Sequence, residues 1–183
     1  MPVHESGAQT IVIQNVESLM AIPGFMSITG EEQGLISGSS FKQGHEDKIE
    51  IHSFEHLVEL PFHPDTQVAS GEAVHRPITL CKEVDISTPK LYQALCHKEI
   101  LETAEIRWFR HTPDGHEELF YMVSLQKGMI VRMKPWMPDF FDERLEHYRP
   151  MEQVSLVYEA ILWSWGAEGD VEYESVWYGG ASR

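Results

Sequence analysis

Apolar and polar residues alternate along several short stretches of the chain, which is typical of strands with one buried face. These stretches cover residues 24–29, 79–85, 104–108, 119–125, 129–133 and 172–178. Turn-forming residues lie between some of them, most clearly the run Thr112-Pro113-Asp114-Gly115. The pattern predicts a mostly antiparallel β domain that closes as a barrel or a sandwich.

The segment 48–60 changes the face on which its apolar residues lie. Ile49 and Ile51 share one parity, whereas Phe54 and Val58 have the other. Because a shift of one position turns every side chain to the opposite face of a sheet, we expect a bulge or bend near His52.

Two segments have apolar residues at helical spacing. Thr88 is expected to cap a helix that has Pro89 in its first turn. Its apolar stripe consists of Leu91, Tyr92, Leu95 and Cys96. The segment 151–165 is apolar on both faces, so periodicity alone fits a helix or a strand. Its β-branched and aromatic content favours a strand that is covered on both sides.

The composition describes a globular domain with an acidic surface. The chain has 183 residues, of which 42% are hydrophobic, and its net charge is −15. Such a charge disfavours binding to nucleic acid or anionic lipid. No apolar stretch approaches the roughly 20 residues of a membrane span, and the N-terminus lacks the pattern of a signal peptide. The two cysteines, Cys81 and Cys96, fit a reducing cytosol and are expected to be buried or half-buried thiols.

Candidate catalytic and metal-binding chemistry is sparse. His52 and His56 have an i, i+4 spacing, but on a strand they stand too far apart to chelate, and no third ligand is placed by the sequence. Nucleophile-elbow and glycine-rich nucleotide motifs are absent. We therefore expect no cofactor, no metal and no enzymatic activity. The alternative to a protein without such chemistry is a metal- or ligand-binding β-sandwich protein of unknown substrate. Oligomer size is the cheapest measurement that separates these possibilities.

Several short blocks follow one another in a distinctive order between Gly24 and Trp177. They are Gly44-His45-Glu46-Asp47, Gly71-Glu72 with Val74-His75-Arg76-Pro77, Thr88-Pro89 with Leu91, Ala94 and Leu95, Trp108-Phe109-Arg110 with Gly115 and Glu117, and Glu152 with Val154-Ser155-Leu156, Tyr158, Ile161 and Trp163. In these blocks the chain resembles the Hcp family, the tube proteins of the bacterial type VI secretion system, which are similar to phage tail tube proteins. The resemblance implies a mainly β fold: a two-sheet antiparallel β-barrel with one α-helix packed alongside.

The resemblance also implies an organisation and a function. Residues 23–178 form a single barrel domain, preceded by a partly ordered extension (1–22) and followed by a short tail (179–183). The chain is expected to form homohexameric rings that stack into the exported inner tube. Its expected partners are other copies of itself, the sheath and spike components, and small effectors carried in the lumen. It would be made in the cytoplasm and secreted through the system without a signal peptide, and no fused toxin domain is expected after Trp177.

The loop 61–75 is the candidate for contacts between rings. It is long for a connection between strands, and Pro61, Pro64 and Gly71 limit its conformations. Matching loops in the family project from the ring face, so we expect this one to reach a neighbouring ring or subunit; the other possibility is a merely solvated loop. The candidate ring-stacking residues are Pro61, His63, Asp65, Gln67, Ser70 and Glu72.

Overall fold

The computed structural model describes residues 23–139, 141–145 and 149–177. The expected extension 1–22 and tail 179–183 lie outside the described residues. None of the helices formed by the described residues has the length and apolar character needed to cross a membrane.

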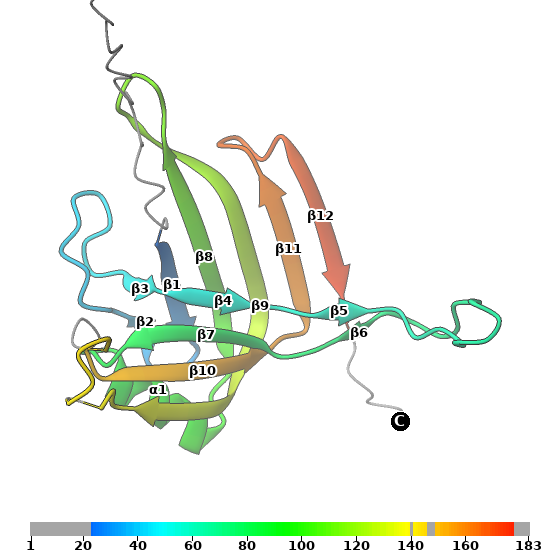
Figure 1. The fold of residues 1–183 in the computed structure, drawn as a ribbon, viewed down its shortest axis with the longest axis horizontal. Helices are drawn as coiled ribbons and strands as arrows, with labels where there is room; N and C mark the ends of the chain where they lie inside the picture. The colour runs from blue at the N-terminus through cyan, green and yellow to red at the C-terminus, as the bar shows by residue number, and fades with distance from the viewer. Residues whose placement is uncertain (1–22, 140, 146–148, 178–183) are drawn as a thin grey trace, which may run out of the picture.

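The described residues form one helix, α1 (Thr88–His97), and a set of antiparallel strands (Figure 1). The strands are β1 (Gly24–Gly30), β2 (Gly34–Ile36), β3 (Ile49–Ile51), β4 (Ser53–Glu55), β5 (Val58–Glu59), β6 (Val74–His75), β7 (Ile78–Glu83), β8 (Leu101–His111), β9 (Glu117–Trp136), β10 (Met151–Val157), β11 (Ala160–Trp165) and β12 (Val171–Val176).

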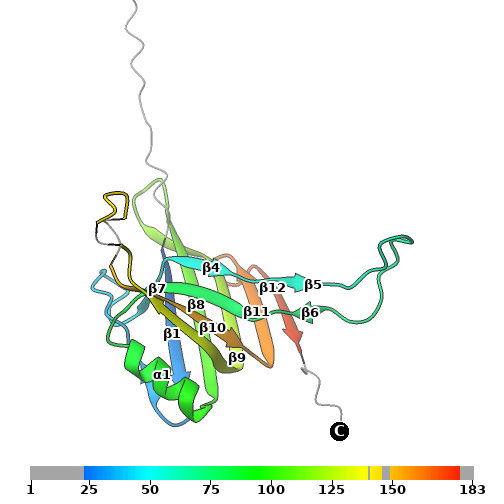
Figure 2. The same ribbon diagram turned by 60° about the horizontal axis from the view of Figure 1, so that its bottom comes forward.

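The strands make two sheets that share β9. In the first sheet, β1, β8, the first half of β9, β11 and β12 lie side by side, and β2 and β3 border the outer side of β1. In the second sheet, β10 pairs with the second half of β9, β7 pairs with β10, and β4 pairs with β7. The strands of the second sheet run across those of the first (Figure 1). The helix packs beside the barrel near β9 (Figure 2).

One corner between the sheets is a bend in β9. Residues 119–125 and 129–133, predicted as two strands, form this single strand. Their shared parity fits one strand, and the polar residues between them belong to the corner and not to a turn. The single alternating face predicted for 129–133 is not kept, because a register shift opposite Ser155 and Leu156 leaves Val131 exposed and Ile130 buried.

The other corner lies at His52, as the change of apolar face predicts. β3 pairs with β1 in the first sheet, and β4 pairs with β7 in the second, so the chain passes from one sheet to the other between them. The N–H of His52 donates to the carbonyl of Cys81 at 2.8 Å. Strand pairing can thus be followed from β1 through β8, β9, β10 and β7 to β4 and back by way of β3. The mainly β, two-sheet barrel fold is confirmed.

The ambiguous segment 151–165 forms β10 and β11, which are interrupted at Tyr158 and Glu159. The two strands follow one another along β9, β10 in the second sheet and β11 in the first. Met151, Val154 and Leu156 are buried. The expectation of a covered strand was right in kind, but it missed the interruption.

Three local expectations need correction. Ser87, not Thr88, is the N-cap residue of α1, and it makes no side-chain capping bond, whereas Pro89 does lie in the first turn. Leu91 and Ala94 are the buried residues of the helix, and Cys96 is exposed because it lies on the solvent face. Cys81 is half-buried as expected. The connection 30–47, where the alternation predicts no strand, contains β2.

Candidate assembly surfaces

The predicted loop 61–75 is part of a two-stranded arm, defined here as residues 57–76. Its root is the β5–β6 pair, in which Val58 lies opposite His75. Farther out, the N–H of Ser70 donates to the carbonyl of Pro61 at 2.8 Å, and the N–H of His63 donates to Val68 at 2.9 Å. The arm projects away from the barrel in both ribbon views (Figures 1 and 2). The sequence had indicated a long loop here, but the structure shows a hairpin.

All the predicted ring-stacking residues lie on this arm and have exposed side chains. They are Pro61, His63, Asp65, Gln67, Ser70 and Glu72. Gln67 adopts a left-handed backbone conformation with φ 56°, and its N–H donates to the carbonyl of His63 at 2.8 Å. The structure therefore gathers the candidates on one projecting element. What they contact remains a prediction.

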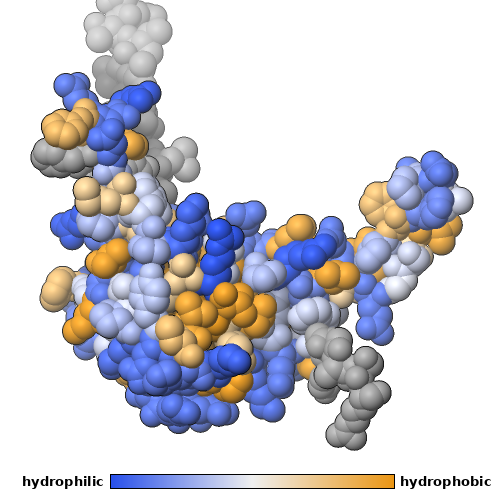
Figure 3. All heavy atoms as spheres, turned by 90° about the horizontal axis from the view of Figure 1, so that it is seen from below, coloured by the Kyte–Doolittle hydropathy of each residue, from blue (hydrophilic) through white to orange (hydrophobic). Residues whose placement is uncertain are grey.

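The exposed apolar residues of the arm were not predicted from the sequence. They are Leu57, Val58, Leu60, Phe62 and Val68. The hydrophobic atoms at the end of the arm stand clear of the barrel in the surface view (Figure 3). Exposed apolar side chains gathered on a projecting element mark a contact surface for another molecule. The density of apolar residues in 57–62 was the available signal, although residues 57–60 also belong to the segment 48–60 in which the apolar face changes.

A second candidate surface is β12, which pairs only with β11 among the described strands. Its Val171, Tyr173 and Val176 are exposed. The other end of the same sheet is bordered by the short strand β2, where Leu35 is exposed. An open strand edge carries unpaired N–H and C=O groups, so natural proteins cover or pair it. Among the described residues, β12 is therefore an open edge at one end of this sheet.

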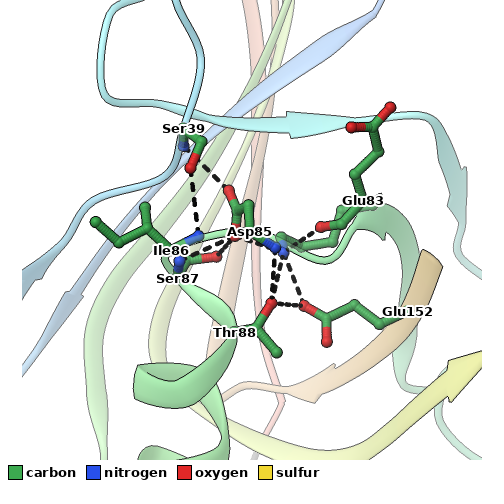
Figure 4. Close-up of polar contacts among 8 residues, drawn as sticks. Ser39, Glu83, Asp85, Ile86, Ser87, Thr88 and Glu152 are labelled. Carbon is green, nitrogen blue, oxygen red and sulfur yellow. Dashed lines mark hydrogen bonds and ion pairs between the residues drawn. The ribbon is translucent and has the colours of Figure 1, made fainter. Parts of the chain in front are cut away.

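A buried ion pair fixes the joint between β7, β10 and α1. Lys82 and Glu152 face each other across the two strands, and their side chains are 1% and 0% exposed. The Lys82 ammonium donates to Oε1 of Glu152 at 2.7 Å and to Oδ1 of Asp85 at 2.8 Å. The hydroxyl of Thr88 donates to the same Glu152 oxygen at 2.8 Å (Figure 4). Oε2 of Glu152 is buried and accepts no hydrogen bond from the described residues.

Asp85 extends this network to the loop before β3. Its Oδ2 accepts the N–H of Ser39 at 3.0 Å, and its Oδ1 accepts the N–H of Ser87 at 2.9 Å (Figure 4). Burial by itself raises the pKa of Asp85, but hydrogen bonds from Lys82 and Ser87 outweigh it and hold that pKa below its ordinary value. The sequence carried a signal for the pair, because Lys82 has the same strand parity as the buried Ile78 and Leu80.

Two further polar residues hold connections onto the barrel. Oε1 of Glu99 accepts the backbone N–H groups of Glu32 and Gln33 at 3.0 and 2.8 Å, and so fixes the turn between β1 and β2. His45, buried in the loop before β3, stacks on Phe25 with ring centroids 3.9 Å apart. Nε2 of His45 lies 2.7 Å from a carboxylate oxygen of Glu117. These contacts fix the β1–β2 turn and the loop before β3 on the first sheet.

The structure places no enzyme-like arrangement at the positions considered from the sequence. Within the described ranges, no group of three or more His, Cys, Asp or Glu side chains could hold a metal ion. His52 is exposed, and His56 instead contacts the hydroxyl of Tyr158 at 2.7 Å. One hollow, of about 660 Å³, is lined by residues that include Ser39, Lys42 and Arg149.

Known proteins share both the sequence and the fold. A family described as "Type VI secretion system effector, Hcp" matches residues 25–165. The "Major exported protein" of Pseudomonas aeruginosa is 34% identical over 159 residues, which cover 82% of this chain and 92% of that protein.

Two solved structures add the three-dimensional comparison. The crystal structure of an Hcp protein superposes with a TM-score of 0.81 at 31% identity and covers 87% of this chain and 100% of its own. Secreted protein Hcp3 from Pseudomonas aeruginosa gives a TM-score of 0.70 at 30% identity, with 86% and 99% covered. The chain therefore belongs to the Hcp family, the exported structural tube proteins of the type VI secretion system, which are not enzymes.

Proposed function

We propose that this chain forms homohexameric rings in which β12 of one subunit meets the opposite sheet edge of the next, and that the arm joins one ring to another. Hexameric rings are characteristic of Hcp proteins. The open edge of β12 is the observation that carries the ring for this chain, because a closed ring leaves no such edge unpaired.

The arm supports the stacking step. Its tip stands clear of the barrel (Figure 1), and its Leu60, Phe62 and Val68 are exposed to solvent. A second ring would cover them. The stacked rings would make the inner tube, which the sheath surrounds and the spike closes, with small effectors carried in the lumen. The chain would be made in the cytoplasm and leave without a signal peptide.

Gel filtration coupled to light scattering tests the ring directly. We expect the mass of six chains at micromolar concentration and rings in negative-stain electron micrographs. A chain that stays monomeric, with no rings in the micrographs, would contradict the proposal. The alternative of a metal- or ligand-binding β-sandwich has no observation in its favour among the described residues, and elemental analysis of untagged protein would detect a bound metal.

A further inference from the structure

Three polar side chains meet where the arm joins the barrel, and we call His56, His75 and Tyr158 the root triad. Nε2 of His56 lies 2.7 Å from Oη of Tyr158, and Nδ1 of His75 lies 2.9 Å from the same oxygen. His56 directly precedes the arm in sequence, and His75 lies on β6, one residue before the arm ends at residue 76. The phenol of Tyr158, on the barrel, therefore contacts both ends of the arm, one through His56 and the other through His75.

The triad is closed in by aromatic rings. Trp163 of β11 stacks beside His56 with centroids 6.0 Å apart, and Trp177 stacks beside His75 at 6.1 Å. His75 and Tyr158 are buried, and His56 is partly buried. Ring packing limits the water that could replace a lost hydrogen bond, so the protonation states of the imidazoles decide whether the triad is satisfied.

Hydrogen-bond counting sets the limit on protonation. A phenol has one hydrogen to donate, and a neutral imidazole has one donor and one acceptor nitrogen. With one imidazole charged, it donates to Oη while the phenol donates to the other ring. With both charged, both rings donate to Oη, and the phenol hydrogen has no acceptor within the triad. The two positive rings would also stand 6.3 Å apart, centroid to centroid.

Nearby charged groups do not compensate for a second positive charge. On the arm, Arg76 donates to Glu59 at 2.9 and 2.7 Å. Beside Tyr158, Glu159 pairs with Lys127 at 3.4 Å. The remaining neighbours along the chain are Glu55 on β4 and Glu174 on β12, both with exposed side chains. The groups in direct contact are uncharged: Phe54 of β4, Trp163 of β11, Ser175 of β12 and Trp177.

Burial lowers the pKa of His56 below its ordinary value of 6.5, and the neighbouring His75 lowers it further. Burial also lowers the pKa of His75. A group whose pKa is lower in the folded state stabilises that state above its ordinary pKa and ceases to do so as the pH falls through the folded value. The root is therefore firmest near neutral pH and weakens in moderate acid.

We propose that the root triad is a pH-sensitive latch, which fixes the arm on the barrel near neutral pH and releases it in acid when both imidazoles are charged. If the arm joins rings as proposed above, acid would also loosen the stack. The latch itself is a property of the single chain and can be measured without that function.

Hydrogen–deuterium exchange of the full chain tests the latch, with mass spectrometry of peptides from 57–76 at about pH 7.5 and about pH 5. After correction for the intrinsic effect of pH, we expect arm exchange to be severalfold faster in acid, because the pKa values of both imidazoles are lowered in the folded chain. His56→Gln and His75→Gln, which stay neutral, should each abolish this acid step. His63→Gln, at the exposed tip of the same arm, should retain it.

His56 is only partly buried, so H56Q remains informative even if H75Q misfolds. Equal corrected exchange of the wild-type arm at both pH values would overturn the latch, as would an acid step that survives in H56Q. Light scattering of the same samples separates the two proposals. A chain without rings that shows the acid step contradicts the ring and supports the latch, and rings without the step do the reverse.

Discussion

Lys82 shows how this fold carries a charge inside its barrel. Its side chain is 1% exposed, and burial of a lone ammonium would cost several kcal/mol. Glu152, Asp85 and the carbonyl of Glu83 surround it at 2.6–2.8 Å, so the charge is met by opposite charge and by hydrogen bonds. The same contacts tie β7 to β10 and to the start of α1. The ion pair thus fixes the relative positions of these elements more than it adds net stability.

Removal of the lysine alone should be strongly destabilising. In Lys82→Met, the fully buried Glu152 loses the ammonium that pairs with it, so we expect the free energy of unfolding to fall by about 3–5 kcal/mol. The double variant Lys82→Met with Glu152→Met should lose much less, because the buried carboxyl of Glu152 is removed and Asp85 keeps its hydrogen bonds from Ser39 and Ser87. Lys127→Met, an exposed lysine, is the control and should change stability by under about 0.5 kcal/mol. Urea unfolding at one fixed protein concentration measures all three, and equal losses in the single and double variants would contradict this account.

Glu99 should give the protein an acid-sensitive turn. Burial raises the pKa of Glu99, but hydrogen bonds from Gln33 and Glu32 outweigh it, and the net effect is a pKa below 4.5. A lowered pKa stabilises the folded state above about pH 4.5, and this contribution is lost as the pH falls through the folded value. We expect Glu99→Gln to cost about 1.5–3 kcal/mol at pH 7. The difference from the wild type should shrink steadily in thermal melts taken at lower pH. A difference that stays constant down to about pH 3 would show that the charge is irrelevant.

At the scale of elements, the arm is a hairpin that the barrel does not need. Its outer part, 61–70, contacts itself through backbone bonds between Pro61 and Ser70 and between His63 and Val68. Replacement of 61–70 by a short Gly-Ser turn should leave the melting temperature and the ring largely unchanged, since the β5–β6 pair and the root triad remain. Ring stacking and secretion into the medium should be lost, as measured by electron microscopy and immunoblotting.

A matched control for this deletion is the β8–β9 turn. Replacement of Pro113 and Asp114 by Asn and Gly alters another exposed turn without touching the arm, and it should leave stacking and secretion unchanged. If the shortened arm is exported at the wild-type level, the arm is only a connector between β5 and β6.

The sequence predicted elements well where one strand pattern acted alone, and poorly where tertiary packing intervened. The bend at His52 was predictable because the apolar face changes there. The corner in β9 was not, because Gln126, Lys127 and Gly128 have the composition of a turn, and only pairing with β8, β10 and β11 keeps the strand continuous. Strand parity could have revealed the burial of Lys82.

The candidate surfaces divide in the same way. The position of the arm followed from the length of its loop and its Pro and Gly residues, but its hairpin pairing depends on contacts that alternation does not record. The root triad was out of reach, because Tyr158 lies 102 residues from His56 and 83 from His75. Side chains so far apart in sequence meet only through the topology of the sheets.

At the scale of the whole molecule, assembly must bring together copies of a strongly acidic chain. Each carries a net charge of −15, so neighbouring subunits repel one another wherever their charges face within a Debye length. The proposed contact surfaces reduce this cost, because Val171, Tyr173 and Val176 on β12 and Phe62 and Val68 on the arm are apolar. The attraction that closes the ring is thus expected to come from apolar burial and strand pairing, with electrostatics in opposition.

This balance predicts that rings strengthen as salt is added. Between about 0.05 and about 0.5 M sodium chloride the Debye length falls severalfold, which screens repulsion and leaves apolar contacts intact. Sedimentation velocity at one fixed protein concentration should show the fraction of rings rising with salt. Neutralising Glu172 and Glu174 on β12 by substitution with Gln should raise the ring fraction at low salt and flatten the salt dependence. The matched pair Glu102→Gln with Asp114→Asn removes the same charge from exposed positions on β8 and the β8–β9 turn, and should have a smaller effect. Rings that dissociate as salt rises would instead show that ion pairs between subunits dominate the interface.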